Sequence, residues 1–136
     1  MADATVVEAT VGMTTVAPGT QRVTAGEPID EGQPVYLKAA DGKYWQAANT
    51  DAAMSDVKGV SLTPAIADEK FVMARTGDYE CGFATVSGQM YCVSAVSKIS
   101  PISDHTSADW LGVIGWGLPG TNVMHLNLVT TGIVMA

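Results

Sequence analysis

The stretch "EGQPVYLKAADGKYW", residues 31–45, decides the fold. Two β-prone runs, residues 33–37 and 43–47, lie on either side of Asp41 and Gly42, and the second extends just past the stretch. Aspartate followed by glycine is a strong hairpin signal, because glycine readily adopts the positive φ that a tight turn needs. The stretch therefore predicts two antiparallel strands joined at this dipeptide.

Turn signals and short β-rich runs continue along the rest of the chain. We expect further strands at 57–62, 71–75, 90–94, 111–116 and 123–129. The segment "TDAAMSD", residues 50–56, alone has a helical pattern, with room for about two turns. Many short strands separated by regular turns are typical of sandwiches and barrels. The sequence thus predicts an all-β, jelly-roll-like β-sandwich with at most one short helix.

Two short motifs recur at the same offset. "GQPVYL" at position 32 returns as "GQMYCV" at position 88, and "VKGVSL" at position 57 returns as "VIGWGL" at position 113, an offset of 56 in both cases. Between them, Lys43-Tyr44 aligns with Lys98-Ile99 after a slip of one residue. A solenoid would need three or more repeats. The pattern favours a pseudo-symmetric sandwich produced by internal duplication, with coincidence as the alternative.

The 136 residues suit one domain. We assign residues 20–136 to it and residues 1–19 to an extended, β-prone amino-terminal arm. This arm is thinly charged, and its Val6, Val7 and Val11 are candidate interface residues. It can add a strand to a neighbouring subunit or shell, or it can belong to the domain's own sheet.

Charge and hydropathy restrict the partners. Fourteen acidic and seven basic residues give a net charge of −7, which argues against nucleic acid as a partner. No apolar run reaches the ~20 residues of a membrane span. The start lacks the basic and apolar regions of a signal peptide, so we expect synthesis in the cytoplasm and no membrane partner.

The carboxy-terminal residues 111–136 contain no Asp, Glu, Lys or Arg. An exposed edge of this kind would aggregate. The tail must therefore be buried in the domain's own core or against another chain. The second case predicts a small homo-oligomer, most simply a homodimer.

Two cysteines, Cys81 and Cys92, flank a β-prone stretch. A hairpin centred between Val86 and Ser87 would place them opposite each other, close enough for a disulfide. In a cytosolic protein such thiols usually stay reduced and act as small buried hydrophobic residues. Both possibilities remain open from the sequence.

The search for catalytic chemistry finds no convincing group. Asp104, His105 and Ser107 invite comparison with a catalytic triad, but adjacent residues on an extended segment point to opposite sides, and no nucleophile elbow is present. We interpret His105 as a loop histidine. The acidic pairs lie beside turn signals and are most simply solvated loop ends. We expect no enzyme activity, no catalytic residues and no cofactor.

His125 lies in the alternating run "VMHLNLV", where it shares one strand face with Asn127. Two histidines and two separated cysteines lack the spacing of a zinc site, so we predict no metal. An interface contact, or a polar contact with Asn127, is the better interpretation of His125.

Tyr44 and Trp45 are neighbours on the second hairpin strand, so one faces inward and the other outward. An outward aromatic side chain fits a partner-binding surface, because aromatic residues are enriched at interfaces. Partial burial of both residues, from the two sides of a sandwich edge, is the alternative.

The stretch from 23 to 62, followed by "TVSGQMYCVSAVSKISPI", "WLGVIGWGL" and "VMHLNLV", resembles the small capsid cement, or decoration, proteins of tailed bacteriophages. The resemblance covers roughly residues 23–129 and rests on glycine and apolar patterns. It implies a β-sandwich structural protein on the virion exterior, which binds the capsid surface and bridges major capsid protein subunits. The chain departs from the commoner pattern in its bulky Trp45, Trp110 and Trp116, which we count as interface candidates.

Two function classes follow. The first is a capsid cement protein, whose contacts should spread over several faces. The alternative is a carbohydrate- or receptor-binding β-sandwich displayed on the virion, which should present an aromatic groove beside polar groups.

Overall fold

The computed structural model describes residues 4, 6, 11–13, 19–95, 97–104, 109–119 and 122–134. Within them lie strands β1 (Gly12–Met13), β2 (Gly19–Thr24), β3 (Pro34–Lys38), β4 (Lys43–Gln46), β5 (Val57–Ser61), β6 (Lys70–Glu80), β7 (Met90–Val93), β8 (Ile99–Pro101), β9 (Trp110–Gly117) and β10 (Val123–Val134), and one 3-10 turn, η2 (Ile102–Asp104). The all-β prediction is confirmed.

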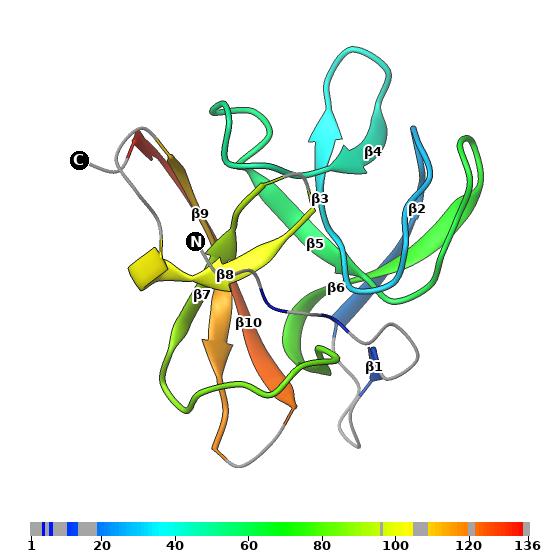
Figure 1. Ribbon diagram of the computed structural model, residues 1–136. Helices are drawn as coiled ribbons and strands as arrows, with labels where there is room; N and C mark the ends of the chain where they lie inside the picture. Colours follow the sequence, from blue (N-terminus) through cyan, green and yellow to red (C-terminus); the bar gives the residue numbers. More distant parts are fainter. Residues whose placement is uncertain are drawn as a thin grey trace.

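The strands form one curled antiparallel sheet in the order β4-β3-β5-β6-β10-β9-β7-β8, with β1 and β2 also paired to β6. Figure 1 shows two groups of strands, β2 to β6 on the right and β7 to β10 on the left, which meet at the β6–β10 pair. The sheet curls into a half-barrel, so its two groups face a shared interior in a sandwich-like way.

The two groups repeat each other's pairing. The partners Pro34 with Val60, Val35 with Gly59 and Tyr36 with Val57 recur 56 positions later as Met90 with Trp116, Tyr91 with Gly115 and Cys92 with Val113. Both sets contain the same bulge, at Lys58 in β5 and at Ile114 in β9. The β3–β4 and β7–β8 pairs correspond with one slipped residue, as the alignment of Lys43 with Lys98 requires. Duplication as the origin of this repeat stays an interpretation.

The opening hairpin forms as its sequence predicts. Leu37 pairs with Tyr44 and Lys38 with Lys43, and Gly42 has a φ of 68°. A residue with a Cβ is disfavoured at such a positive φ. The short-range glycine signal therefore sets the turn, and the turn sets the register of β3 and β4.

Two clusters of buried side chains hold the sheet together. One lies inside the first group of strands and includes Val23, Val35 and Phe71. The larger cluster joins both groups and includes Tyr79 and Met124, which are fully buried. Burial of such side chains contributes roughly 1.5–3 kcal/mol each, so the interior shared by the two groups is a main source of stability.

The carboxy-terminal region lies partly in this larger core. Ile114 and Met124 are fully buried, and Leu126 is nearly so. The charge-free sequence is therefore buried, over these residues, in the domain's own core. The prediction of a homo-oligomer loses one of its reasons and remains untested.

Two local expectations are wrong. Residues 50–56 form turns instead of a helix, although Asp51 Oδ1 accepts a hydrogen bond from Met54 N and Ser55 N donates to Asp51 O. Such a cap favours the start of a helix, but the segment ends after one turn, since β5 begins at Val57. The predicted hairpin around Val86 is also absent from the described pairings, because β6 pairs with β10 and not with β7.

The described residues of the amino-terminal arm contact the same domain. Ala4 N donates to Ile99 O in β8 at 2.8 Å, and β1 pairs with the end of β6. Val6 and Val11 are half-buried and approach Gly32, where a Cβ atom would lie 2.8 Å from Val6 Cγ1. These contacts match the alternative in which the arm belongs to the domain's own sheet; its role as a clamp on a neighbour stays a prediction.

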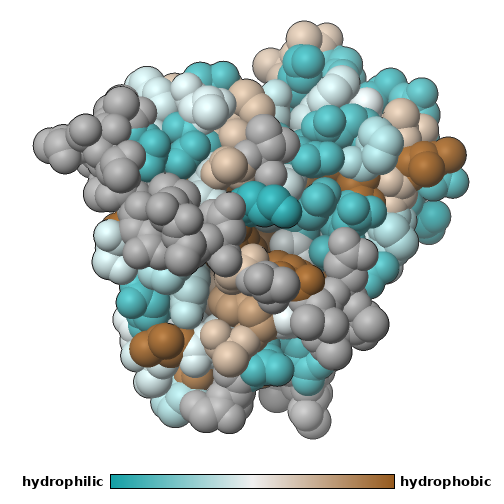
Figure 2. All heavy atoms as spheres, viewed as in Figure 1, coloured by the Kyte–Doolittle hydropathy of each residue, from teal (hydrophilic) through white to brown (hydrophobic). Residues whose placement is uncertain are grey.

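The surface in the same view is mainly hydrophilic, with apolar atoms gathered near the middle of the molecule and in separate spots (Figure 2). The exposed large apolar residues of the described chain are Leu37, Ile66, Val86 and Val129. Among the described residues, no helix has the length and apolar character needed to cross a membrane.

Candidate functional site

A row of three side chains crosses the central strands. His125 in β10 pairs with Asp78 in β6 on one side and with Trp116 in β9 on the other. Because successive residues of a strand face opposite ways, this row lies on the face opposite the buried Tyr79 and Met124. We call Asp78, His125 and Trp116 the outer row.

The members of the outer row touch one another. His125 Nδ1 lies 2.6 Å from Asp78 Oδ1, and the rings of Trp116 and His125 are 4.9 Å apart at an angle of 37°. The His125 and Asp78 side chains are 39% and 41% exposed, and Trp116 is half-buried. The row is thus fixed in place by cross-strand pairing while it stays accessible from outside.

This arrangement suits recognition. In the tautomer in which Nδ1–H donates a hydrogen bond to the Asp78 carboxylate, Nε2 is a hydrogen-bond acceptor. Trp116 adds a large apolar surface, and the half-buried Met90 extends the row because it pairs with Trp116. Tryptophan and methionine are enriched in protein interfaces, and tryptophan is frequent among the residues that dominate binding energy.

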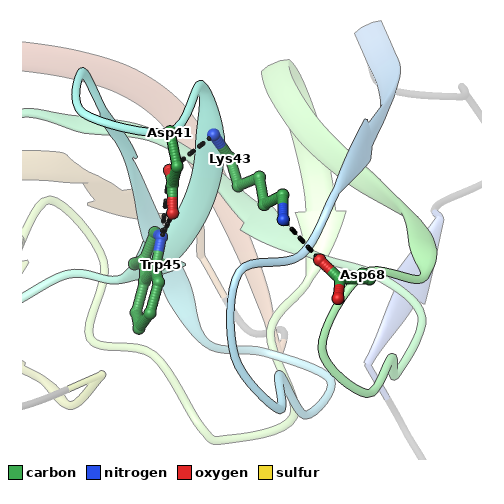
Figure 3. Close-up of polar contacts among 4 residues, drawn as sticks. All are labelled: Asp41, Lys43, Trp45 and Asp68. Carbon is green, nitrogen blue, oxygen red and sulfur yellow. Dashed lines mark hydrogen bonds and ion pairs between the residues drawn. The ribbon is translucent and has the colours of Figure 1, made fainter.

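A second polar cluster holds the opening hairpin (Figure 3). Asp41 accepts hydrogen bonds from Lys43 N, at 2.9 Å, and from Trp45 Nε1, at 3.0 Å. Lys43 Nζ reaches across to Asp68 Oδ1 at 2.5 Å, and Lys38 Nζ lies 4.2 Å from the centre of the Trp45 ring. We call these residues the Trp45 corner.

These contacts shift the pKa values of Asp41 and Lys43 in the Trp45 corner. The hydrogen bond from Lys43 N has the largest effect and lowers the pKa of Asp41; desolvation, the next largest effect, opposes it, and the bond from Trp45 Nε1 lowers the pKa further. The bond to Asp68 raises the pKa of Lys43. Both groups are exposed, so the surrounding water screens their attraction. The cluster shapes the hairpin and contributes little stability through charge.

Tyr44 and Trp45 are both half-buried. Tyr44 packs against the core of the first strand group and Trp45 against the larger core, and the Trp45 ring also covers Gly26, which leaves no room there for a Cβ. Both side chains are thus partly buried, as the alternative held, and their contact with a partner stays a prediction. Trp45 has a structural role at this corner.

The remaining predicted site residues are dispersed. Trp110 opens β9, is half-buried, and donates its backbone N–H to Asn49 O at 2.9 Å. The fold places Trp116 beside His125 and places Val6 and Val11 together near Gly32. These two pairs of residues do not form one site. Val7 and His105 lie outside the described residues.

Asp78 is the site residue that sequence analysis missed. It lies beside a turn signal and resembles a solvated loop residue, whereas β6 continues through it to Glu80. Its partner His125 is 47 positions away. The alternation around His125 indicates an outward strand face, but only the register of β6 against β10 identifies the carboxylate.

The cysteines are buried and free. Burial raises the pKa of Cys81 to about 11 and that of Cys92 to about 12. Cys81 Sγ donates to Asn122 O at 3.2 Å. Thiols with raised pKa values are poor nucleophiles at neutral pH. The two cysteines are therefore reduced, buried core residues, and the described structure has no disulfide between them.

The described part of the chain contains no cluster of three or more His, Cys, Asp or Glu side chains suited to a metal ion. Comparison of the chain with protein-family models, with curated proteins and with solved structures found no match.

Proposed function

We propose that this chain is a structural virion protein that binds the outer surface of a tailed-phage capsid and stabilises it by bridging major capsid protein subunits. The resemblance of residues 23–129 to capsid cement proteins suggests this function, and the all-β fold agrees with it. In this proposal the protein acts on the virion exterior, as a binding protein and not as an enzyme.

The observation that carries the proposal is the outer row. Asp78, His125 and Trp116 are held rigidly by three paired strands, so little conformational entropy is lost when a partner covers them. A half-buried tryptophan beside hydrogen-bonding groups is a suitable anchor for a protein partner.

Modest affinity per site is sufficient for a cement protein. A ligand that binds only the assembled shell stabilises it by RT ln(1 + [L]/Kd), about 2.7 kcal/mol per site at a hundredfold excess over Kd. Many equivalent sites on a shell then add to a large effect. A net charge of −7 favours a shell surface that is neutral or basic at the point of contact.

The test compares undecorated capsids with capsids mixed with the wild-type chain, Trp116→Ala or Leu37→Ala. Leu37 is 42% exposed and lies on β3, outside the outer row, so its variant is the control. We expect the wild type and Leu37→Ala to co-sediment with capsids and to raise their rupture temperature. Trp116→Ala should bind at least tenfold more weakly, since loss of an interface anchor costs roughly 2 kcal/mol or more.

Circular dichroism should show that both variants remain folded. Failure of the wild-type chain to co-sediment with any tailed-phage capsid would count against the proposed function. Equal binding by Trp116→Ala would instead leave the function and remove the outer row from the contact.

A second candidate is a carbohydrate-binding module on the virion. The observation in its favour is the stacking of Trp116 beside His125 and Asp78, because sugar sites combine an aromatic face with polar groups. A glycan array separates the two candidates. Glycan binding that Trp116→Ala abolishes, in a chain that ignores capsids, would favour the sugar binder.

A further inference from the structure

An open pocket of about 470 Å³ lies where β2 and β10 both meet β6. It is separate from the Trp45 corner, and two of its residues are close to the outer row: Thr76 lies two positions before Asp78 in β6, and Asn127 two positions after His125 in β10. The residues that line it are Gly19, Thr20, Arg75, Thr76, Leu126, Asn127 and Leu128.

A β-bulge in β6 presents Arg75 at this pocket. Thr76 pairs with Gly19 and Ala74 pairs with Thr20, so Arg75 is an extra residue without an opposite partner in β2. A bulge bends its strand and redirects a side chain, and bulges are over-represented next to functional sites.

A second bulge forms the opposite wall. In β10, Asn127 and Leu128 together stand opposite the single residue Ile114 of β9. Strands β6 and β10 therefore each contain a bulge just beyond the end of their pairing at Gly77 and Leu126. Residues of both bulges line the pocket. Two bulges at one place indicate a site shaped by the fold, because each one interrupts a ladder that would otherwise continue.

The chemistry of the lining is that of an anion site with an apolar floor. Arg75 is the one charged side chain among the described residues that line the pocket, and Gln21 Oε1 accepts from its Nη1 at 2.7 Å. That contact uses one of the five guanidinium N–H groups and leaves others for a ligand. The Thr20 and Thr76 hydroxyls and the Asn127 amide add further donors, while Leu126 and Leu128 are apolar.

The edge of β10 is open at the same place. On its β6 side, β10 pairs with β6 from Val123 to Leu126, and beyond Leu126 no described strand pairs with that side. A strand edge with unpaired N–H and C=O groups can accept an extended peptide, whose main chain supplies affinity while side-chain pockets supply specificity.

We infer that this pocket binds an extended, acidic segment of a partner protein. The segment adds as a strand to β10 beyond Leu126, places an Asp or Glu carboxylate against Arg75, and lays an apolar neighbour on the half-buried Leu128, since Leu126 is almost fully buried in the core. A carboxylate complements the single cation, and an extended main chain complements the open edge. The inference goes beyond the proposed attachment to a shell and does not depend on it.

The test needs no capsid. The ¹⁵N-labelled full-length chain is titrated with acetyl-Thr-Val-Glu-Val-Thr-amide, with the same peptide carrying Gln in place of Glu, and with sodium acetate. The Glu peptide should shift the backbone amides of Thr20, Arg75, Thr76 and residues 126–128. The Gln peptide should bind about fivefold more weakly, the size expected for an exposed charge pair, and acetate should produce much smaller shifts at equal concentration.

Arg75→Gln should abolish the preference for Glu over Gln and leave the rest of the spectrum unchanged. Arg22→Gln is the matched control, because Arg22 is an exposed arginine of β2 that does not line the pocket, and it should keep the preference. The inference is overturned if neither peptide shifts these amides, if Arg75→Gln still prefers Glu, or if acetate alone reproduces the shifts.

Discussion

Gly115 shows how one residue controls the spacing of two strands. A Cβ atom at this position would collide with the backbone carbonyl oxygen of His125, and the same glycine pairs with Tyr91 on the other side of β9. The close approach of β9 to β10 at His125 therefore requires a residue without a side chain at position 115.

Gly115→Ala should destabilise the protein by about 2–3 kcal/mol, because overpacking against backbone cannot be relieved by a rotamer change. Gly88→Ala is the control: Gly88 has a φ of 75°, but a Cβ added there would meet no atom within 4 Å, so only the cost of the left-handed conformation, about 1–2 kcal/mol, applies. Urea unfolding measures both. A smaller loss for Gly115→Ala than for Gly88→Ala would contradict the close approach of β9 and β10.

Tyr79 is a buried residue with an unmet polar group. It is fully buried, its hydroxyl has no hydrogen-bond partner among the described residues, and burial raises its pKa well above the usual value. Tyr79→Phe should leave the free energy of unfolding unchanged or increase it by up to about 1 kcal/mol, since it removes an unsatisfied group. A loss above this size would show that the hydroxyl has a partner.

The thiols give a prediction about pH. A raised pKa means that Cys81 and Cys92, at about 11 and about 12, hold very little thiolate at pH 8, and the thiolate is the reactive form. We expect modification by a thiol reagent to be about a hundredfold or more slower in the folded protein than in urea, and to accelerate as the pH rises toward 11. Rapid labelling of the native protein at pH 8 would contradict the burial of both residues.

At the scale of elements, local patterns identify most strands. The predicted 33–37, 57–62 and 90–94 agree closely with β3, β5 and β7, because glycine turns and β-branched runs act over a few residues. β2 escaped detection because four of its six residues, Gly-Thr-Gln-Arg, are exposed and show no apolar alternation. Its position depends on β6, which is distant in the sequence.

The candidate site was harder to predict for the same physical reason. The sequence indicates that His125 faces outward, but a cross-strand neighbour is fixed by register, and register depends on pairing across the whole sheet. Asp78 was therefore missed. The two bulges beside the pocket are also invisible in the sequence, since a bulge is a mismatch between two strands.

The amino-terminal arm gives a prediction at this scale. Deletion of residues 2–15 removes β1, the Ala4 bond to β8 and the contacts of Val6 and Val11 at Gly32. We expect the sheet to remain folded, because Ala4 and Val6 pack only at the margin of the larger core and the core of the first strand group contains no arm residue. The thermal midpoint should fall by about 5 °C or more. Binding to capsids should weaken as well.

An unchanged midpoint with lost capsid binding would identify the arm as a clamp on a neighbour. An unchanged midpoint with unchanged binding would contradict both roles. Calorimetry and capsid co-sedimentation on the same preparation separate these outcomes.

At the scale of the whole molecule, the sheet is two similar groups of strands joined at β6 and β10. The shared registers, with one bulge at Lys58 and its counterpart at Ile114, give a rigid framework whose central strands carry the outer row on one face. Tyr79 and Met124, on the other face of β6 and β10, anchor these strands in the larger core. The proposed contact with a shell therefore lies on the most constrained part of the fold.

The most direct test of this account is a cryo-electron microscopy reconstruction of tailed-phage capsids saturated with the purified chain. The account predicts added density on the outside of the shell, with the β6–β10–β9 face turned toward major capsid protein subunits and Trp116 in the contact. Capsids without added density, or a bound chain that turns this face to solvent, would contradict it.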